Sequence, residues 1–224
     1  MKTKCLHCKG ELTKVLEFKE IPIVNNFNKS NKKYKLNLSI CNICKLFQNT
    51  NFPKKELIFD KNYPYLSSTS NVNKQFFKKL KDRFNLKKNS FIIDIGSNDG
   101  TFLNNFKSKK FQHLGIDPSR RACQIAKKRG INCINKFFNY ELSKEILKTY
   151  KKADVIFSSN TLAHVENLND IIMGINHLLS DNGKLIIQNI YLYDVIKNLH
   201  FDQFYHEHLI TYSIESVKNI YSKF

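Results

Sequence analysis

The stretch FIIDIGSNDGTFL, residues Phe91 to Leu103, decides the fold class of this 224-residue chain. A short apolar run, of the kind that forms a buried strand, ends in Gly96, and a helical pattern begins at Thr101 after a polar loop. The loop has the pattern D-x-G-x-x-x-G, whose glycines permit a tight turn and let a ligand approach the backbone. It lacks the Lys-Ser or Lys-Thr pair of a P-loop, and its glycine spacing differs from that of the dinucleotide fingerprint.

Strand and helix patterns alternate along the chain after this loop. The runs FQHLGID, INCINKFF, ADVIFSSN and KLIIQNI are predicted to be strands, and RRACQIAKKRG is predicted to be a helix that ends at Gly130. A further helix is expected from about Asn169 to Leu179. Regular alternation implies parallel strands joined by right-handed crossovers, so the sequence predicts an α/β fold with a doubly wound sheet.

The second predicted strand ends in Asp117, about twenty residues beyond the glycine loop. A carboxylate at this place can accept hydrogen bonds from ribose hydroxyls, because open α/β sheets bind ligands at the carboxyl ends of their strands. Together with the loop, Asp117 favours a cofactor that contains adenosine. The alternative for the loop is a purely structural turn between strand and helix.

The chain carries 37 Lys and Arg against 19 Asp and Glu, a net charge of +18. Such a charge favours anionic partners such as nucleic acid, a membrane surface or phosphorylated metabolites. The lysines are accompanied by abundant Asn and Ile, however, as an AT-rich genome produces, so charge alone names no ligand. The N-terminal MKTKCLHCKG lacks the apolar run of a signal peptide, and no stretch approaches about eighteen apolar residues, which predicts a cytoplasmic protein without a membrane partner.

Four of the six cysteines form two closely spaced C-x-x-C pairs: Cys5, Cys8, Cys41 and Cys44. Four thiolates at this spacing are the ligand set that zinc prefers in a structural site, and they leave no coordination position for a substrate. A redox pair and buried free thiols are the alternatives, and His7, inside the first pair, is a less favoured ligand. Cys123 and Cys133 are interpreted as ordinary core residues.

Three segments of the chain differ in their residue composition and in their apolar pattern. Residues 1–55 are short, irregular and cysteine-bearing, residues 56–90 are helical and basic, and residues 91–224 carry the alternating α/β pattern. The sequence therefore predicts a zinc-binding domain, a helical connector and a cofactor-binding domain, in that order.

The segments DIGSNDGTFL and GIDPS resemble the class I S-adenosylmethionine-dependent methyltransferases. In their order along the chain, the two C-x-x-C pairs, NNF, YPYLSSTS, NTLAHVENLND and FDQFYHEHLITYS further resemble the sugar C-methyltransferases that act on nucleotide-linked ketosugars. The resemblance covers nearly the whole chain. It implies a class I methyltransferase-type doubly wound sheet preceded by a small cysteine-rich zinc-binding domain. It also implies S-adenosylmethionine and structural zinc as cofactors and a nucleotide-diphosphate 4-ketosugar as substrate.

The resemblance assigns a set of residues to the cofactor: Asp94, Gly96, Asn98, Gly100, Asp117, Phe138 and Asn160. By this assignment the residues from 94 to 100 line the methionine and ribose end, and Asp117 holds the ribose hydroxyls. Phe138 lies near the adenine, and Asn160 lines the methyl-transfer cleft. Residue type alone favours a core role for Phe138.

The implied reaction is C-methylation beside a ketone, which requires a base, a hydrogen-bond donor near the keto oxygen and an aligned methyl sulfonium. The residues that the resemblance assigns to it are His208, Tyr205, Glu207, His164, Tyr65 and Tyr63. His208 removes the proton, while Tyr205 and Glu207 shape the pocket. His164 and one tyrosine of YPY assist at the oxygen, and His206 is a bystander.

Residue types alone leave other roles open for this set. His208 is equally a surface histidine on a loop, His164 a histidine at a helix start, and the YPY tyrosines packing residues. A regular strand would send Glu207 and His208 to opposite faces, so FYHEHL must bend or end if both reach one site.

The chain also departs from the pattern of these relatives. They continue beyond the point at which this sequence ends, and the strand KLIIQNI carries Gln188 and Ile190 where Glu and Pro are expected. A helix from about Ile214 would have no returning strand, which leaves a sheet edge unpaired. We expect a truncated product, a split protein whose second half is a separate chain, or a minimal enzyme.

Two other functions stay open at this point. One is an RNA or DNA methyltransferase whose zinc module and positive charge bind nucleic acid, although no base-methylating signature supports it. The other is a non-catalytic remnant or partner subunit that binds the cofactor, or its other half, without turnover.

Overall fold

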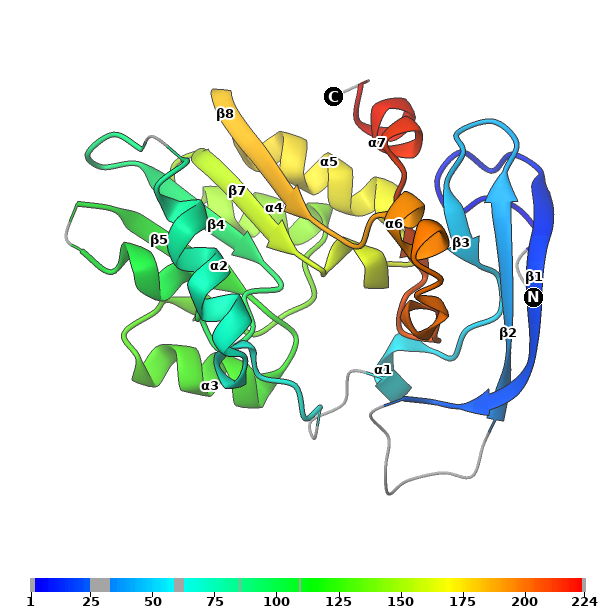
Figure 1. The fold of residues 1–224 in the computed structure, drawn as a ribbon. Helices are drawn as coiled ribbons and strands as arrows, with labels where there is room; N and C mark the ends of the chain where they lie inside the picture. Colours follow the sequence, from blue (N-terminus) through cyan, green and yellow to red (C-terminus); the bar gives the residue numbers. More distant parts are fainter. Residues whose placement is uncertain (1–2, 25–32, 59–62, 85, 109, 223–224) are drawn as a thin grey trace. The chain divides into compact units, whose positions relative to one another are not determined.

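The computed structural model describes residues 3–24, 33–58, 63–84, 86–108 and 110–222, and the stretch NNF at 25–27 lies outside them (Figure 1). The chain forms two compact units. The first unit comprises residues 1–58, 160–169 and 189–224, and the second comprises residues 59–159 and 170–188.

The second unit is built on a five-stranded sheet in the order β6-β5-β4-β7-β8 (Figure 1). Its strands are β4 (Phe91–Ile95), β5 (Gln112–Ile116), β6 (Cys133–Ile134), β7 (Ala153–Ser159) and β8 (Leu179–Gln188). All neighbours pair in parallel, with β4 between β5 and β7. The chain order reverses on either side of β4, which is where open α/β sheets bind ligands. The predicted α/β fold with a doubly wound parallel sheet is confirmed.

Helices cover both faces of this sheet: η1 (Ser67–Thr69), α2 (Asn71–Lys81), η2 (Leu103–Phe106), α3 (Arg120–Lys128), α4 (Tyr140–Leu147) and α5 (Leu168–Leu178). Helices α2 and α3 lie on one face, and α4 and α5 on the other (Figure 1). The core beneath α2 and α3 is rich in phenylalanine: Phe77, Phe84, Phe102, Phe106 and Phe157. The predicted helices α3 and α5 are confirmed, and α3 ends just before Gly130, whose φ is 76°. Helix α4, which Asn139 caps by accepting from the Leu142 N–H, was not predicted.

Cys123 of α3 and Cys133 of β6 form a disulfide, which corrects their interpretation as ordinary core residues. The two side chains are buried in the phenylalanine-rich core, so the interpretation was right about their burial and wrong about their being free thiols. Their Cα atoms lie 5.6 Å apart, which is within the reach of a disulfide bond. The ten-residue separation of the two cysteines gave no sign of this approach.

The first unit is built on an antiparallel sheet in the order β1-β2-β3-β9 (Figure 1). Its strands are β1 (Leu12–Pro22), β2 (Lys33–Cys41), β3 (Phe47–Asn49) and β9 (Ile210–Thr211). Its helices are α1 (Lys55–Ile58), η3 (Leu162–His164), α6 (Leu192–Lys197), η4 (Phe201–Gln203) and α7 (Ile214–Tyr221). The description of residues 1–55 as irregular is therefore wrong. No side chain of β1 is fully buried, and bulges between Lys14 and Leu16 and between Phe18 and Glu20 interrupt the alternation of its apolar residues.

Segments from both ends of the chain form the core of the first unit: Leu36, Leu38, Phe47, Leu192, Val195 and Phe204. The prediction of three consecutive domains, 1–55, 56–90 and 91–224, stays a prediction, because compactness does not report which segments fold alone. Among the described residues, no helix is long and apolar enough to cross a membrane.

Candidate functional site

In the second unit, the glycine loop of residues 96–101 follows the central strand β4. Its backbone has a positive φ at Gly96 (78°), Asn98 (50°) and Gly100 (75°), a region that glycine adopts freely and asparagine tolerates. A side chain at Gly100 would also place its Cβ 3.2 Å from Ala126 and 3.1 Å from Ile131. The loop therefore needs both glycines for its turn, and Gly100 also for its packing on α3.

Asp94 and Asp117 carry buried carboxyl groups at this edge of the sheet. Asp117 follows β5, and its Oδ2 accepts from the Asn98 N–H while its Oδ1 accepts from the Ser119 N–H, both at 2.8 Å. Burial raises the pKa of Asp117 to about 6, so the group is largely ionised at pH 7. Burial, and then the charge of Asp117, raises the pKa of Asp94 well above its ordinary value. The oxygens of Asp117 keep further lone pairs, which suit the hydroxyl donors of a ribose.

Phe138 and Asn160 are the other two predicted cofactor residues. Phe138 is buried, and a Cβ on Gly174 would lie 2.9 Å from its ring, so Phe138 packs against α5. Asn160 directly follows β7, is exposed and has a φ of 53°. It belongs to the first unit. Their proposed contacts with the cofactor stay predictions.

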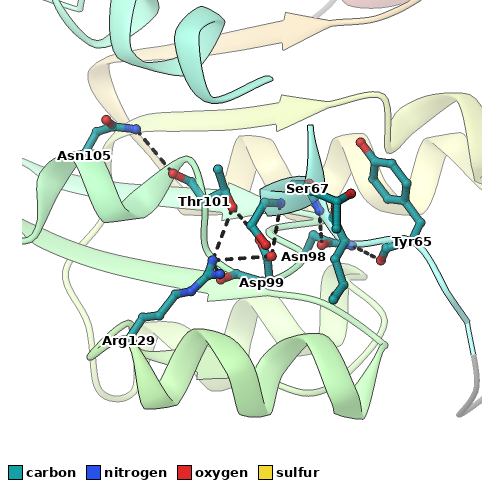
Figure 2. A network of polar contacts seen from close by, with 10 residues as sticks. Tyr65, Ser67, Asn98, Asp99, Thr101, Asn105 and Arg129 are labelled. Carbon is teal, nitrogen blue, oxygen red and sulfur yellow. Dashed lines mark hydrogen bonds and ion pairs between the residues drawn. The ribbon is translucent and has the colours of Figure 1, made fainter. Parts of the chain in front are cut away.

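The tyrosines of YPY also belong to the second unit. Tyr63 is half-buried, whereas Tyr65 is 45% exposed. The Tyr65 hydroxyl accepts a hydrogen bond from Asn73 Nδ2 at 2.8 Å. Figure 2 shows that the Tyr65 backbone lies against Asn98, next to a polar network around Asp99. Sequence reasoning missed Asp99, although a charged residue between the two glycines of the loop is a signal that could have found it.

In the first unit, residues 205–208 form a turn, in which the His208 N–H lies 3.1 Å from the Tyr205 carbonyl oxygen. This is the bend that FYHEHL needs. The Tyr205 hydroxyl lies 2.8 Å from His208 Nε2, and His208 Nδ1 lies 2.8 Å from the Gln203 carbonyl oxygen. Because a carbonyl only accepts, Nδ1 carries the proton and Nε2 accepts from the tyrosine hydroxyl.

His164 stands beside this pair, with its ring centroid 5.1 Å from that of His208. Its Nδ1 donates to the Glu207 carbonyl oxygen at 2.6 Å, so its Nε2 is an acceptor. Burial, and then the nearby His208, lowers the pKa of His164 to about 4, and burial also lowers the pKa of His208. Both imidazoles are therefore neutral at pH 7, and Glu207 is buried as well.

Backbone hydrogen bonds attach these histidines to the antiparallel sheet. The N–H of Asn49, at the end of β3, donates to the Leu209 carbonyl at 2.9 Å, and the Leu209 N–H donates to the Ala163 carbonyl at 2.8 Å. His206 Nε2 donates to the Tyr34 carbonyl of β2 at 3.0 Å. His206 thus ties the turn to strand β2 of the sheet. Leu209, the residue after His208, is bonded both to β3 and to Ala163, the residue before His164.

The four predicted metal ligands, Cys5, Cys8, Cys41 and Cys44, meet at the other end of this sheet, with all sulfur atoms within 4.8 Å of one another. Metal–sulfur bonds of about 2.3 Å in a tetrahedron separate the sulfur atoms by about 3.8 Å, so the donor set fits a tetrahedral metal. The His7 ring instead faces Asn169, with Nδ1 and Oδ1 2.6 Å apart, and takes no part in the cluster. The Leu6 N–H donates to Gln48 Oε1 at 2.9 Å, which links the first cysteine pair to β3.

The structure therefore groups the predicted residues into two sets. The four cysteines, His164 and the turn at 205–208 belong to the first unit, and the glycine loop, Asp117 and Tyr65 belong to the second. Each set is connected within its own unit by the contacts described above.

Residues 68–224 match the family model described as a methyltransferase domain. The chain is 26% identical over 192 residues to the C-methyltransferase NovU of Streptomyces niveus, covering 84% of this chain and 46% of NovU. The chain thus spans about half the length of that relative.

The solved structures that share the fold include the following two. The YcgJ protein of Bacillus subtilis has a TM-score of 0.53 at 13% identity, over 66% of this chain and 67% of YcgJ. The plantazolicin methyltransferase BpumL in complex with SAH has a TM-score of 0.51 at 19% identity, over 67% of this chain and 60% of BpumL. At these identities the likeness supports the α/β fold alone.

Proposed function

Because the chain belongs to the methyltransferase domain family, we propose that it transfers a methyl group from S-adenosylmethionine to a carbon atom next to a ketone. The proposed acceptor is a nucleotide-linked 4-ketosugar, in the cytoplasmic synthesis of deoxysugars or surface polysaccharides. The likeness to a C-methyltransferase supports transfer to carbon. The observation that carries the proposal is the hydrogen-bonded pair of Tyr205 and His208.

The chemistry defines what the chain must supply. A sugar C–H bond is inert unless a neighbouring keto group accepts, as an enolate, the electron pair that proton removal leaves. S-adenosylmethionine supplies a methyl group on a sulfonium ion; the enolate carbon bonds to this methyl carbon, and the electrons of the broken carbon–sulfur bond stay on sulfur. The chain must therefore provide a base and a hydrogen-bond donor for the keto oxygen, both held in place.

His208 is the proposed base. The Gln203 carbonyl orients its ring, and its lowered pKa keeps the imidazole neutral and able to accept a proton at pH 7. Its Nε2 lone pair faces the Tyr205 hydroxyl. We therefore assign Tyr205 to a relay: its oxygen takes the substrate proton while its own hydroxyl proton passes to His208 Nε2. Glu207 contributes to the polar surroundings of the pair.

Tyr65 is the proposed donor to the keto oxygen. Its hydroxyl oxygen accepts from Asn73, so its proton can be donated elsewhere. His164 Nε2 is an acceptor while Nδ1 donates to Glu207, so His164 cannot donate to a keto oxygen in this tautomer. We therefore assign His164 to the support of the turn at residues 205–208.

Zinc is the proposed metal of the four-cysteine cluster. Thiolates are the ligands that zinc prefers in closed structural sites. Zinc would hold together the two chain segments that bear the cysteine pairs, and it takes no part in the reaction.

The nucleotide part of the substrate rests on two supports. One is the ordered set of motifs that resembles the sugar C-methyltransferases. The other is the net charge of +18, which suits a diphosphate.

Deuterium exchange tests the proposed base without methyl transfer. The protein is incubated in D₂O with a nucleotide-linked 4-ketosugar and SAH, and mass spectrometry follows deuterium next to the ketone. We expect exchange with the native chain, about 10³-fold slower exchange with His208→Asn, and a C-methylated product once S-adenosylmethionine replaces SAH. The relay predicts that Tyr205→Phe also slows the exchange.

The proposal would be overturned if 4-ketosugar nucleotides gave neither deuterium exchange nor a methylated product. Methylation of RNA or DNA under the same conditions would favour the nucleic-acid methyltransferase instead. Binding of SAH without any turnover would favour a non-catalytic subunit.

A further inference from the structure

The glycine loop holds a second segment of the chain through its two central side chains (Figure 2). Asn98 Oδ1 accepts from the Ser67 N–H at 2.8 Å, and Asn98 Nδ2 donates to the Tyr65 carbonyl at 3.2 Å. Asp99 Oδ2 accepts from the Ser68 N–H at 3.1 Å. We call these three contacts the loop hydrogen bonds. They join residues 65–68 to a short loop that lies more than thirty positions later in the sequence.

The bound segment depends on these contacts because it has no cap of its own. Ser67 and Ser68 begin the 3₁₀ helix η1, and the first N–H groups of a helix need acceptors from outside it. The residue at the cap position is Leu66, which makes no side-chain hydrogen bond to the helix. Asn98 and Asp99 supply the acceptors that a local Ser, Thr or Asp would otherwise provide.

Asp99 is itself held rigidly. Its side chain is fully buried, and its Oδ1 accepts from the Thr101 hydroxyl at 2.6 Å. Arg129 Nη1 lies 3.4 Å from Asp99 Oδ2 and donates to the Asp99 carbonyl at 3.0 Å (Figure 2). A buried carboxylate with a cationic partner and two hydrogen-bond donors has one stable position.

Asn98 connects the bound segment to the proposed ribose site. Its N–H donates to Asp117 Oδ2 at 2.8 Å, while its side chain contacts Ser67 and Tyr65. With a φ of 50°, Asn98 can present its backbone to Asp117 and its side chain to the segment at once. Both the oxygen and the nitrogen of the Asn98 side-chain amide are thus engaged by the segment at residues 65–68.

From these contacts we infer that Asn98 and Asp99 are positioning residues, which fix the Tyr65 hydroxyl for the keto oxygen through the loop hydrogen bonds. The inference rests on the proposed function. Asn73 sets the direction of the hydroxyl, and the loop sets the position of the backbone that carries it. Because Asn98 of the same loop also donates its N–H to Asp117, a cofactor bound at Asp117 stabilises the segment at residues 65–68 and holds Tyr65 more firmly in place.

The direct test is amide hydrogen exchange at Ser67 and Ser68, which reports the loop hydrogen bonds whether or not methyl transfer occurs. We expect SAH to slow exchange at both amides in the native chain. Asn98→Gly keeps the positive φ and removes the side chain, so exchange at Ser67 should accelerate about tenfold and respond less to SAH. Asn105→Ala is the matched control, because the Asn105 amide donates only to the carbonyls of residues 101 and 102.

The kinetic test separates positioning from cofactor binding. Asn98→Gly should lower kcat about tenfold and change the SAH dissociation constant less than about threefold. In a Tyr65→Phe background the same substitution should have almost no further effect on kcat, because both substitutions remove the same function, the hydrogen bond from Tyr65 to the keto oxygen. Asp99→Asn should keep most of kcat, since its amide oxygen can face Ser68 while its NH₂ donates to Thr101.

Two results would overturn the inference. One is unchanged exchange at Ser67 and Ser68 in Asn98→Gly. The other is a double variant, Asn98→Gly with Tyr65→Phe, whose loss of kcat equals the product of the losses of the two single variants. Absence of any methyl transfer, with the exchange results as expected, would count against the proposed function and leave the loop hydrogen bonds established.

Discussion

The two units hold their functional residues in different ways. In the second unit, one loop after β4 adopts its shape through three positive φ angles and one carboxylate, Asp117, at the end of the next strand. In the first unit, His164 and His208 come from distant segments and are joined through a sheet that carries the cysteine cluster. A site made of local backbone is stable wherever the sheet is intact. A site assembled from distant segments depends on whatever holds those segments together.

Metal removal should therefore affect the two units unequally, and this is the largest effect we expect. Without metal the two cysteine pairs are no longer joined, and β3 loses the support that fixes β9 and the turn at residues 205–208. We expect chelation or Cys41→Ser to reduce methyl transfer by about 10³-fold or more, while the SAH dissociation constant changes less than about twofold. The measurements are elemental analysis, a transfer assay and calorimetric titration with SAH.

Cys123→Ser is the control for this prediction, because Cys123 lies in the second unit and the substitution should leave the metal content unchanged. An equal loss of SAH binding and of transfer on chelation would show that the metal supports the whole chain. Normal transfer by the metal-free protein would show that the sheet holds the histidines unaided.

The second prediction tests the histidine cluster alone. His208→Asn removes the proposed base, so transfer at saturating substrate should fall about 10³-fold with an unchanged SAH dissociation constant. His200→Asn is the matched control, because His200 is exposed and lies in the same part of the chain. A loss of less than about tenfold for His208→Asn would remove His208 from the chemistry.

The same difference between the units explains what the sequence could predict. Strands β4 and β7, helix α3 before Gly130 and the turn after β4 follow from short local patterns, and all were predicted. The β1–β2 pair was missed: bulges interrupt the apolar alternation in β1, whereas the alternation of Tyr34, Leu36, Leu38 and Ile40 in β2 is a signal that could have found that strand. The disulfide and the approach of His164 to His208 were not readable from spacing, because long-range packing creates both.

The third prediction concerns the backbone-built site. Asp117→Asn leaves one acceptor oxygen and turns an NH₂ group toward the N–H of Asn98 or Ser119, which breaks one of two buried hydrogen bonds. We expect SAH affinity to fall about tenfold to 10²-fold, with kcat at saturating S-adenosylmethionine within about threefold of the native value. Asp82→Asn, at an exposed position, is the control. Unchanged affinity would mean that the ribose does not bind at Asp117.

The smallest expected effect is the pH dependence of SAH binding, which distinguishes a buried carboxylate from a neutral acceptor. Burial raises the pKa of Asp117 to about 6 in the free chain, and ribose hydroxyls donate to the ionised form. Binding then requires loss of the proton, so affinity should be nearly constant above pH 7 and fall about tenfold between pH 7 and pH 5. Calorimetry across this range measures the effect, and Asp117→Asn should remove it. A native affinity that is flat from pH 5 to pH 8 would show that Asp117 binds the ribose without ionising, and the contrast between the two units would then rest on backbone geometry alone.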